Sequence, residues 1–289
     1  MGGFWYNILT RFSGLLGAWL FALVSRIIAC GYFIFSANVQ ESNRFYSILF
    51  PGKSSIYYRW CSFRQYQRFT TIHLDRFLTA RTGPPRFTAH GWERLEACIG
   101  KQGGILLMSH LGNWEIAANL LKEQCQDLQL LLYMGEKQKE GVERLQKEQL
   151  RESGVTIIGT GKDANNPFSA VEGIRFLQNG GLVSMTGDII WRDDQRQVEV
   201  TFLDHIAYVS EAPFIFALVS GAPLFVFFAF RVGTNSYHLT LSEPICVSSA
   251  DRQKRQENIR QAAQQYASLL EEALRSHPFA WYHFTRFIH

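Results

Sequence analysis

Gly104-Ile-Leu-Leu-Met108 runs directly into Ser109-His-Leu-Gly-Asn-Trp-Glu115, and these twelve residues decide the predicted fold. The first five form an unbroken apolar run, which is typical of a strand buried on both faces of a sheet. Gly112 supplies a bend and Asn113 is a good N-cap, so we expect a helix to begin before Glu115. α/β folds place their chemistry at the carboxyl ends of strands, and the polar residues after Met108 stand at such an end.

Further strands and helices alternate along the rest of the chain. Helical periodicity continues from residue 113 to 123, and a charged helix is expected at 137–152. The other predicted strands are 128–134, 155–158, 182–186, 224–231 and 237–241, and the other helices are 169–178, 211–220 and 253–275. Strands that alternate with helices of about ten to fifteen residues predict an α/β domain with a layered, mainly parallel sheet flanked by helices.

The N-terminal third has a different texture. Residues 1–80 carry eight Lys/Arg and two acidic residues, a net charge of +6, which leaves −2 for the remaining 209 of the 289 residues. Aromatic and basic residues alternate through 41–85, where we expect helices with a turn at Pro51-Gly52. The predicted organisation is a membrane anchor or interfacial helix at 1–40, a basic aromatic helical region at 41–85 and the α/β domain at 86–289.

Residues 12–35 form an apolar segment in which Arg26 is the single charge. The length suffices to span a bilayer, for which about 20 apolar residues are needed as helix. Three hypotheses stay open: a single span or deep anchor, a helix lying in the membrane interface, or a core helix of the fold. A cleaved signal peptide fits poorly, because bulky Phe35 stands where a small residue belongs before a cut after Ala37.

Composition limits the function further. Hydrophobic residues make up 47% of the chain and charged residues 19%, which excludes a disordered or fibrous protein, and a net charge of +4 does not demand nucleic acid. The 14% of aromatic residues suggests apolar ligands or lipid contact. The five cysteines are dispersed, so free thiols in a reducing compartment are expected rather than a disulfide framework.

His110 and Glu115 are the candidate reaction centre. Two residues five apart diverge by roughly 140° on one helix, so they converge only if the helix begins between them. Glu115 could then accept a hydrogen bond from Nδ1–H of His110, which leaves Nε2 free as a base. The alternative is a histidine and a glutamate that merely cap a helix. A metal site is less well supported, because this spacing differs from the H-E-x-x-H pattern.

The segment Gly159-Thr-Gly-Lys-Asp-Ala164 imitates a dinucleotide-binding fingerprint. Asn165-Asn-Pro167 interrupts the helix that should follow, so no nucleotide cofactor is expected. Gly187 and Asp188 follow a predicted strand. The carboxylate of Asp188 either binds a substrate group or a hydrogen-bond donor beside His110, or it simply ends the strand. Trp191 and Arg192 are candidates for the acceptor site, and Arg231 is a candidate phosphate contact.

The His-x-x-x-x-Glu motif after a strand resembles the glycerolipid and lysophospholipid acyltransferase superfamily. The chain looks most like its bacterial branch of lipid A biosynthesis (late) acyltransferases. Three later blocks are similar to that family in the same order: Gly187-Asp188, the segment 221–231 with its Ala-Pro-apolar strand, and the closing segment 277–287. Relatives carry an arginine after the third strand, where this chain has Lys162, and lysine lacks the bidentate fork of arginine.

The resemblance implies transfer of a fatty acyl group from a thioester to a hydroxyl or amine of a lipid or glycolipid, with His110 as general base and Glu115 orienting it. It implies a bacterial inner-membrane enzyme whose catalytic domain faces the cytoplasm. No cofactor is expected beyond acyl carrier protein or coenzyme A as the acyl carrier, and membrane lipids and acyl carrier protein are the expected partners. Residues expected to contact substrate are Asn113, Lys162, Asp188, Trp191, Arg192 and Arg231. An acyl thioesterase and a non-catalytic lipid-binding membrane protein remain alternatives.

Overall fold

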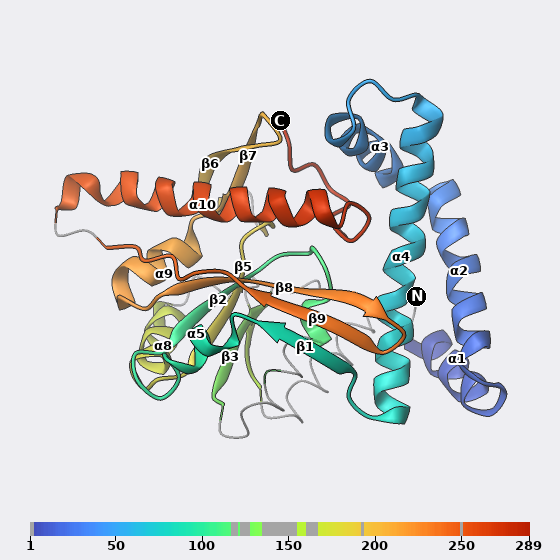
Figure 1. Cartoon of the computed structure of the whole chain (residues 1–289), viewed down its shortest axis with the longest axis horizontal. Helices are drawn as coiled ribbons and strands as arrows, with labels where there is room; N and C mark the ends of the chain where they lie inside the picture. The colour runs from blue at the N-terminus through green and yellow to red at the C-terminus, as the bar shows by residue number, and fades with distance from the viewer. Residues whose placement is uncertain are drawn as a thin grey trace.

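The computed structural model describes residues 3–116, 121, 128–134, 155–159, 167–191, 194–248 and 251–289. The predicted charged helix at 137–152, most of the helix after Asn113, Lys162 and Arg192 lie outside these residues. Figure 1 shows a sheet with a long helix, α10 (Arg255–Ser276), along one side and a group of N-terminal helices at one end of its strands.

The sheet has seven strands in the order β1-β9-β8-β2-β5-β3-β4. Five neighbouring strands, from β8 to β4, are parallel, and β9 runs antiparallel to β8 with β1 parallel to β9. This confirms the predicted α/β class. The strands are β1 (Arg86–His90), β2 (Gly104–Met108), β3 (Leu130–Met134), β4 (Thr156–Gly159), β5 (Leu182–Thr186), β8 (Leu224–Gly233) and β9 (Ser236–Leu241).

Both faces of the sheet are covered, which explains why β2 is apolar throughout. Alternate residues of β2 enter different cores: Ile105 and Leu107 pack in one cluster, and Leu106 and Met108 pack in the other. The first cluster includes the inner faces of α9 (Ala212–Ser220) and α10. The second includes residues of α5 (Trp92–Glu96) and Ile116. Helix α8 (Pro167–Gln178) and the short 3₁₀-helix η2 (Arg252–Lys254) also belong to the α/β part.

A hairpin of β6 (Gln197–Phe202) and β7 (His205–Ser210) forms a separate two-stranded sheet against α10. These two strands were not predicted, although buried and exposed residues alternate along β6 as is typical of a strand. Strand β1 and helix α5 were also not predicted, because both are short and β1 lies at the sheet edge with largely exposed residues.

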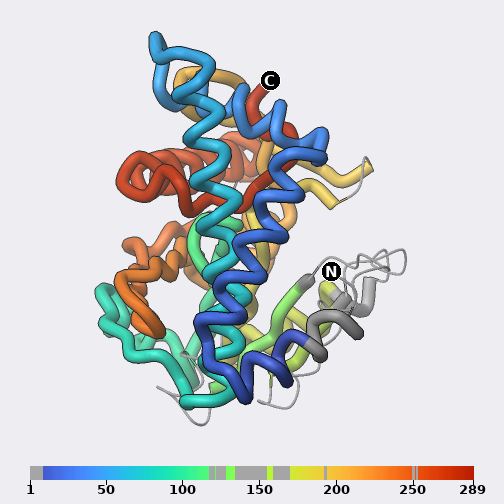
Figure 2. The backbone as a smooth tube through the Cα atoms, turned by 90° about the vertical axis from the view of Figure 1, so that its right-hand side faces the viewer, coloured from blue at the N-terminus to red at the C-terminus, as the bar shows by residue number. Residues whose placement is uncertain are grey.

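Four helices form the N-terminal region: α1 (Gly3–Leu16), α2 (Ala18–Phe35), α3 (Asn38–Leu49) and α4 (Ser55–Thr82). The apolar segment 12–35 is two helices rather than one, because Gly17 adopts a φ of 105° between α1 and α2. Figures 1 and 2 both show α2 running beside α4. In Figure 1, α4 stands across the end toward which the arrow of β8 points, so it covers the carboxyl ends of the parallel strands.

Candidate active site

His110 and Asp188 meet because of strand register. β2 and β5 are parallel neighbours in which Met108 is paired with Thr186, so the residues two positions beyond each strand end emerge side by side. The Nδ1 of His110 lies 3.0 Å from Oδ1 of Asp188, and the backbone N–H of His110 donates to Oδ2 at 2.7 Å. Two hydrogen bonds between the same two residues fix both the position and the orientation of the imidazole.

Asp188 is held ionised in a buried position. Its side chain is fully buried, and burial raises the pKa of its carboxyl group, but the neighbouring His110 outweighs this and lowers the pKa to about 2. The indole Nε1 of Trp281 donates a further hydrogen bond to Oδ2 at 2.9 Å. An ionised Asp188 accepts from Nδ1–H of His110, so Nε2 carries the lone pair that a general base needs.

Glu115 lies in the first helical turn, as predicted, but it does not make the hydrogen bond to His110 that was predicted for it. The hydrogen bond from Nδ1 of His110 goes to Asp188, whereas the carboxylate of Glu115 forms a bidentate ion pair with Arg76 of α4. The Nε and Nη2 atoms of Arg76 lie 2.8 and 2.5 Å from its two oxygens. An arginine fork matches a carboxylate in this way, so Glu115 ties the start of the helix after β2 to α4.

The predicted bend and cap are confirmed. Gly112 has a φ of 87°, and a side chain there would collide with the backbone carbonyl of Ala229, so this position requires glycine. Asn113 precedes the helix, and its Oδ1 accepts from the backbone N–H of Ile116 at 3.4 Å. Its Nδ2 donates to the hydroxyl of Tyr237, which makes Asn113 a buried structural link rather than an open contact.

The segment 280–282 closes the site from the far end of the chain. The backbone N–H of Gly112 donates to the carbonyl of Ala280 at 2.9 Å, and the N–H of Tyr282 donates to the carbonyl of His110 at 2.8 Å. Trp281 is thereby inserted beneath the loop and reaches Asp188. Trp281 was not predicted as a site residue; its place in the closing segment 277–287, which resembles the family, is the signal that points to it.

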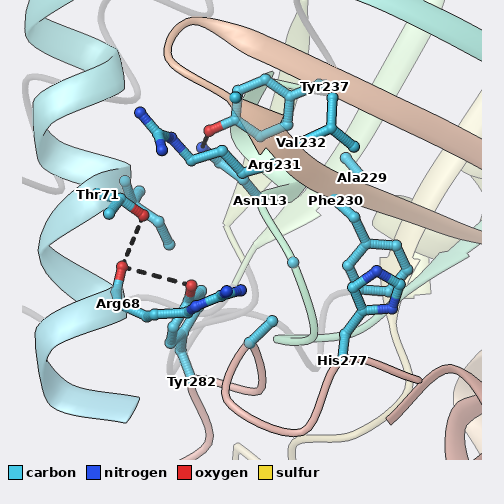
Figure 3. Close-up of a pocket in the computed structure, with 14 residues that line it drawn as sticks. Arg68, Thr71, Asn113, Ala229, Phe230, Arg231, Val232, Tyr237, His277 and Tyr282 are labelled. Carbon is cyan, nitrogen blue, oxygen red and sulfur yellow. Dashed lines mark hydrogen bonds between the residues drawn. The ribbon is translucent and has the colours of Figure 1, made fainter. Parts of the chain in front are cut away.

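A second buried ion pair joins α4 to β8. Asp75, fully buried, accepts from Nε of Arg231 at 2.6 Å and from the hydroxyl of Tyr237 at 2.6 Å. The adjacent residues Asp75 and Arg76 therefore pair with partners of opposite charge on two different segments. Arg231 also lines a pocket of ≈ 210 Å³ between α4, the end of β8 and the C-terminal segment (Figure 3).

Of the other residues that were predicted to contact substrate, Trp191 is described by the structure. Trp191 is half-buried, and its backbone N–H donates to the side chain of Gln195. Among the described residues, no group of three or more His, Cys, Asp or Glu side chains forms a possible metal site.

A family model for bacterial lipid A biosynthesis acyltransferases matches residues 62–287. The match contains β2 with its His110 loop, Asp188, α4 from residue 62 onward and the closing segment. The chain belongs to this family. A comparison with curated proteins gives no match.

Membership identifies the His110 loop as part of an acyltransferase that transfers an acyl group to a lipid acceptor. Lipid A acyltransferases are typically associated with membranes. In this acyltransferase, one described helix, Ala18–Phe35, is long and apolar enough to cross a bilayer, which is weak evidence for attachment.

Proposed function

We propose that the protein transfers a fatty acyl group from an acyl thioester, carried by acyl carrier protein or coenzyme A, to a hydroxyl or amine of a membrane lipid or glycolipid. The hydrogen bond from Nδ1 of His110 to the buried carboxylate of Asp188 is the observation that carries this proposal. It leaves Nε2 as the acceptor of a proton. The imidazole is 23% exposed, so a substrate hydroxyl can approach it.

The reaction follows from this geometry. Nε2 of His110 removes the proton of the acceptor hydroxyl or amine as the acceptor atom attacks the thioester carbonyl carbon. The tetrahedral intermediate collapses with cleavage of the C–S bond, and the thiolate leaves with the proton that the imidazolium returns. Asp188 stabilises the imidazolium through Nδ1–H without taking the proton itself. General-base assistance of this kind contributes roughly 10²–10⁴-fold.

A helix that lies in the membrane interface accounts for α2 better than a transmembrane span, which would lead α2 away from the catalytic domain. α2 contacts α4 along its length: Phe33 packs edge-on to Tyr66 with ring centroids 5.9 Å apart, and Phe21 stacks on Phe77 at 4.9 Å. Between these contacts, Gln67 donates to the carbonyl of Arg26. Because α4 is ion-paired to the sheet, a helix packed along it stays beside the catalytic domain.

The opposite side of α2 provides the apolar surface that a bilayer would cover. Several large side chains there are exposed: Trp19, Leu23, Ile27, Tyr32, Ile34 and Phe35. Arg11 and Arg26 would lie at the level of anionic headgroups. We place the catalytic domain on the cytoplasmic side of the bacterial inner membrane, because acyl carrier protein and coenzyme A thioesters are made in the cytoplasm.

The deciding experiment compares wild type with His110→Ala. Each protein receives a labelled acyl carrier protein thioester, or acyl-coenzyme A, with a bacterial lipid extract, and the products are identified by mass spectrometry. A lipid heavier by one acyl group, formed by wild type alone, is the expected result. Free fatty acid alone would show a thioesterase, and identical products from both proteins would remove His110 from the reaction.

A further inference from the structure

The pocket in Figure 3 has an unusual balance of charge. Its lining comes from α4, the His110 loop, β8, β9 and the C-terminal segment, and it contains two arginines, Arg68 and Arg231, and no acidic residue. The other polar side chains are neutral hydrogen-bonding groups, among them Asn113, Tyr237 and Tyr282. A concave site of this composition favours an anion.

The two arginines differ in whether their charge is already balanced. Arg231 forms its bidentate ion pair with Asp75, and in Figure 3 its guanidinium group points toward α4. No carboxylate of the described residues lies within ion-pair distance of Arg68. Figure 3 shows the Arg68 side chain extending from α4 between Tyr282 and His277, toward the middle of the pocket. Arg68 is therefore the cation available to a ligand.

The described groups around Arg68 carry no negative charge that would repel an anion. Burial raises the pKa of the Tyr282 phenol to about 12, so the hydroxyl stays neutral, and it donates its proton to the backbone carbonyl of Arg68 at 3.5 Å. Burial lowers the pKa of His277, whose ring stacks on Phe230 with centroids 3.7 Å apart. The imidazole is thus neutral at physiological pH, and the stacked rings form an apolar wall opposite the guanidinium.

We propose that the Arg68 pocket binds a phosphate group carried by a substrate of the acyl transfer. The planar fork of arginine matches phosphate oxygens, and the volume of ≈ 210 Å³ admits a phosphate with its ester linkage. The inference deepens the proposed function and rests on it for the identity of the substrate, although binding of a phosphate can be measured without turnover.

Position in the chain assigns this phosphate to the acceptor lipid. Gly112 and Asn113 line the pocket and follow His110 by two and three residues, and two residues span at most roughly 7 Å. A phosphate held there lies near the hydroxyl or amine that His110 deprotonates. The phosphate of a phosphopantetheine donor stands at the far end of a long arm from its thioester, so it would lie farther from the reacting carbonyl.

Binding is tested on the full chain in detergent by calorimetric titration with three probes. These are a short-chain diacylglycerol phosphate, the same diacylglycerol without phosphate, and free phosphopantetheine. Wild type is compared with Arg68→Gln and Arg68→Lys. Arg64→Gln is the matched control, because Arg64 is also exposed on α4 but lies over Trp60 and Phe279 and does not line the pocket. Circular dichroism confirms that each variant is folded.

We expect wild type and Arg64→Gln to bind the lipid phosphate more tightly than the neutral lipid. Arg68→Gln should weaken phosphate binding roughly 10- to 100-fold, because charge-assisted hydrogen bonds are lost, and Arg68→Lys should weaken it less. Equal binding of the two lipids, or equal losses in the Arg64 and Arg68 variants, would overturn the proposal. Selective loss of phosphopantetheine binding would overturn the assignment to the acceptor.

The result of this binding test is independent of the result of the acyl-transfer test. His110→Ala should keep full binding of the lipid phosphate while losing acyl transfer. If wild type formed no acylated lipid but bound the phosphate through Arg68, the proposed function would fail and the pocket would stand.

Discussion

His110 is oriented by Asp188, a residue 78 positions later in the chain, and not by Glu115 of its own motif. The relationship arises because β2 and β5 are neighbours in register, with Met108 opposite Thr186. The motif residue Glu115 instead connects to Arg76 of α4. Orientation of the His110 imidazole and attachment of α4 thus depend on two different carboxylates.

Asp188→Asn is expected to reduce acyl transfer by roughly 10²–10⁴-fold. An amide can neither fix Nδ1–H as the donor with the same strength nor stabilise the imidazolium. Initial rates with a labelled thioester and lipid extract measure the loss. His110→Ala is the reference, and the double variant should be no slower than the slower single variant. Near-normal activity of Asp188→Asn would contradict the assigned role.

Removing one partner of the Arg76–Glu115 pair should destabilise the protein by about 3 kcal/mol, because the remaining charge is left nearly buried. Glu115→Gln and Arg76→Gln are compared by denaturant unfolding, together with the double variant. The two losses should be strongly non-additive, since each substitution breaks the same contact. Arg44→Gln, in an exposed pair with Glu41, is the control and should change stability little. Additive losses would show that the pair is not coupled.

The lowered pKa of Asp188 predicts that the stability of the protein depends on pH in the acid range. Its folded pKa of about 2 lies below the usual value of 3.8, so the ionised carboxylate stabilises the folded state above about pH 4, and this contribution is lost as the pH falls through about 2. The shift corresponds to about 2 kcal/mol. The difference in unfolding free energy between wild type and Asp188→Asn should shrink by this amount over that range. A constant difference would contradict the prediction.

Polar substitutions on the exposed side of α2 should release the protein from membranes without unfolding it. Leu23→Ser with Ile27→Ser removes two exposed apolar side chains and should weaken binding to anionic vesicles about tenfold or more. Vesicle flotation measures binding, and thermal unfolding should be nearly unchanged. Phe21→Ser is the contrasting variant, because Phe21 is buried against Phe77 and its loss should lower stability. Unchanged flotation of the double variant would remove this side of α2 from the membrane contact.

Much of the fold could be predicted because its strands and helices have distinct periodicities. The apolar runs of β2 and β5 were predicted with the bounds that the structure has. The helical region 41–85 and its turn at Pro51-Gly52 also match α3 and α4. Local patterns suffice for such elements because they arise from which faces are buried.

The partner of His110 could not be predicted in the same way, because it depends on strand order. Nothing local to residues 104–115 states that β5 lies beside β2. A usable signal existed: His110 and Asp188 each stand two residues beyond a predicted strand of five residues. Adjacent parallel strands of equal length would bring them together. The Glu115 hypothesis failed because it considered only partners within the motif, whereas α4 supplied Arg76.

The position of residues 280–282 also has a consequence during synthesis. The ribosome releases β2 and β5 long before Trp281, so His110 and Asp188 can meet while the indole that completes the carboxylate's hydrogen bonds is still absent. A nascent or proteolytically shortened chain therefore holds an unfinished reaction centre. The full set of hydrogen bonds around Asp188 therefore forms only after Trp281 has left the ribosome.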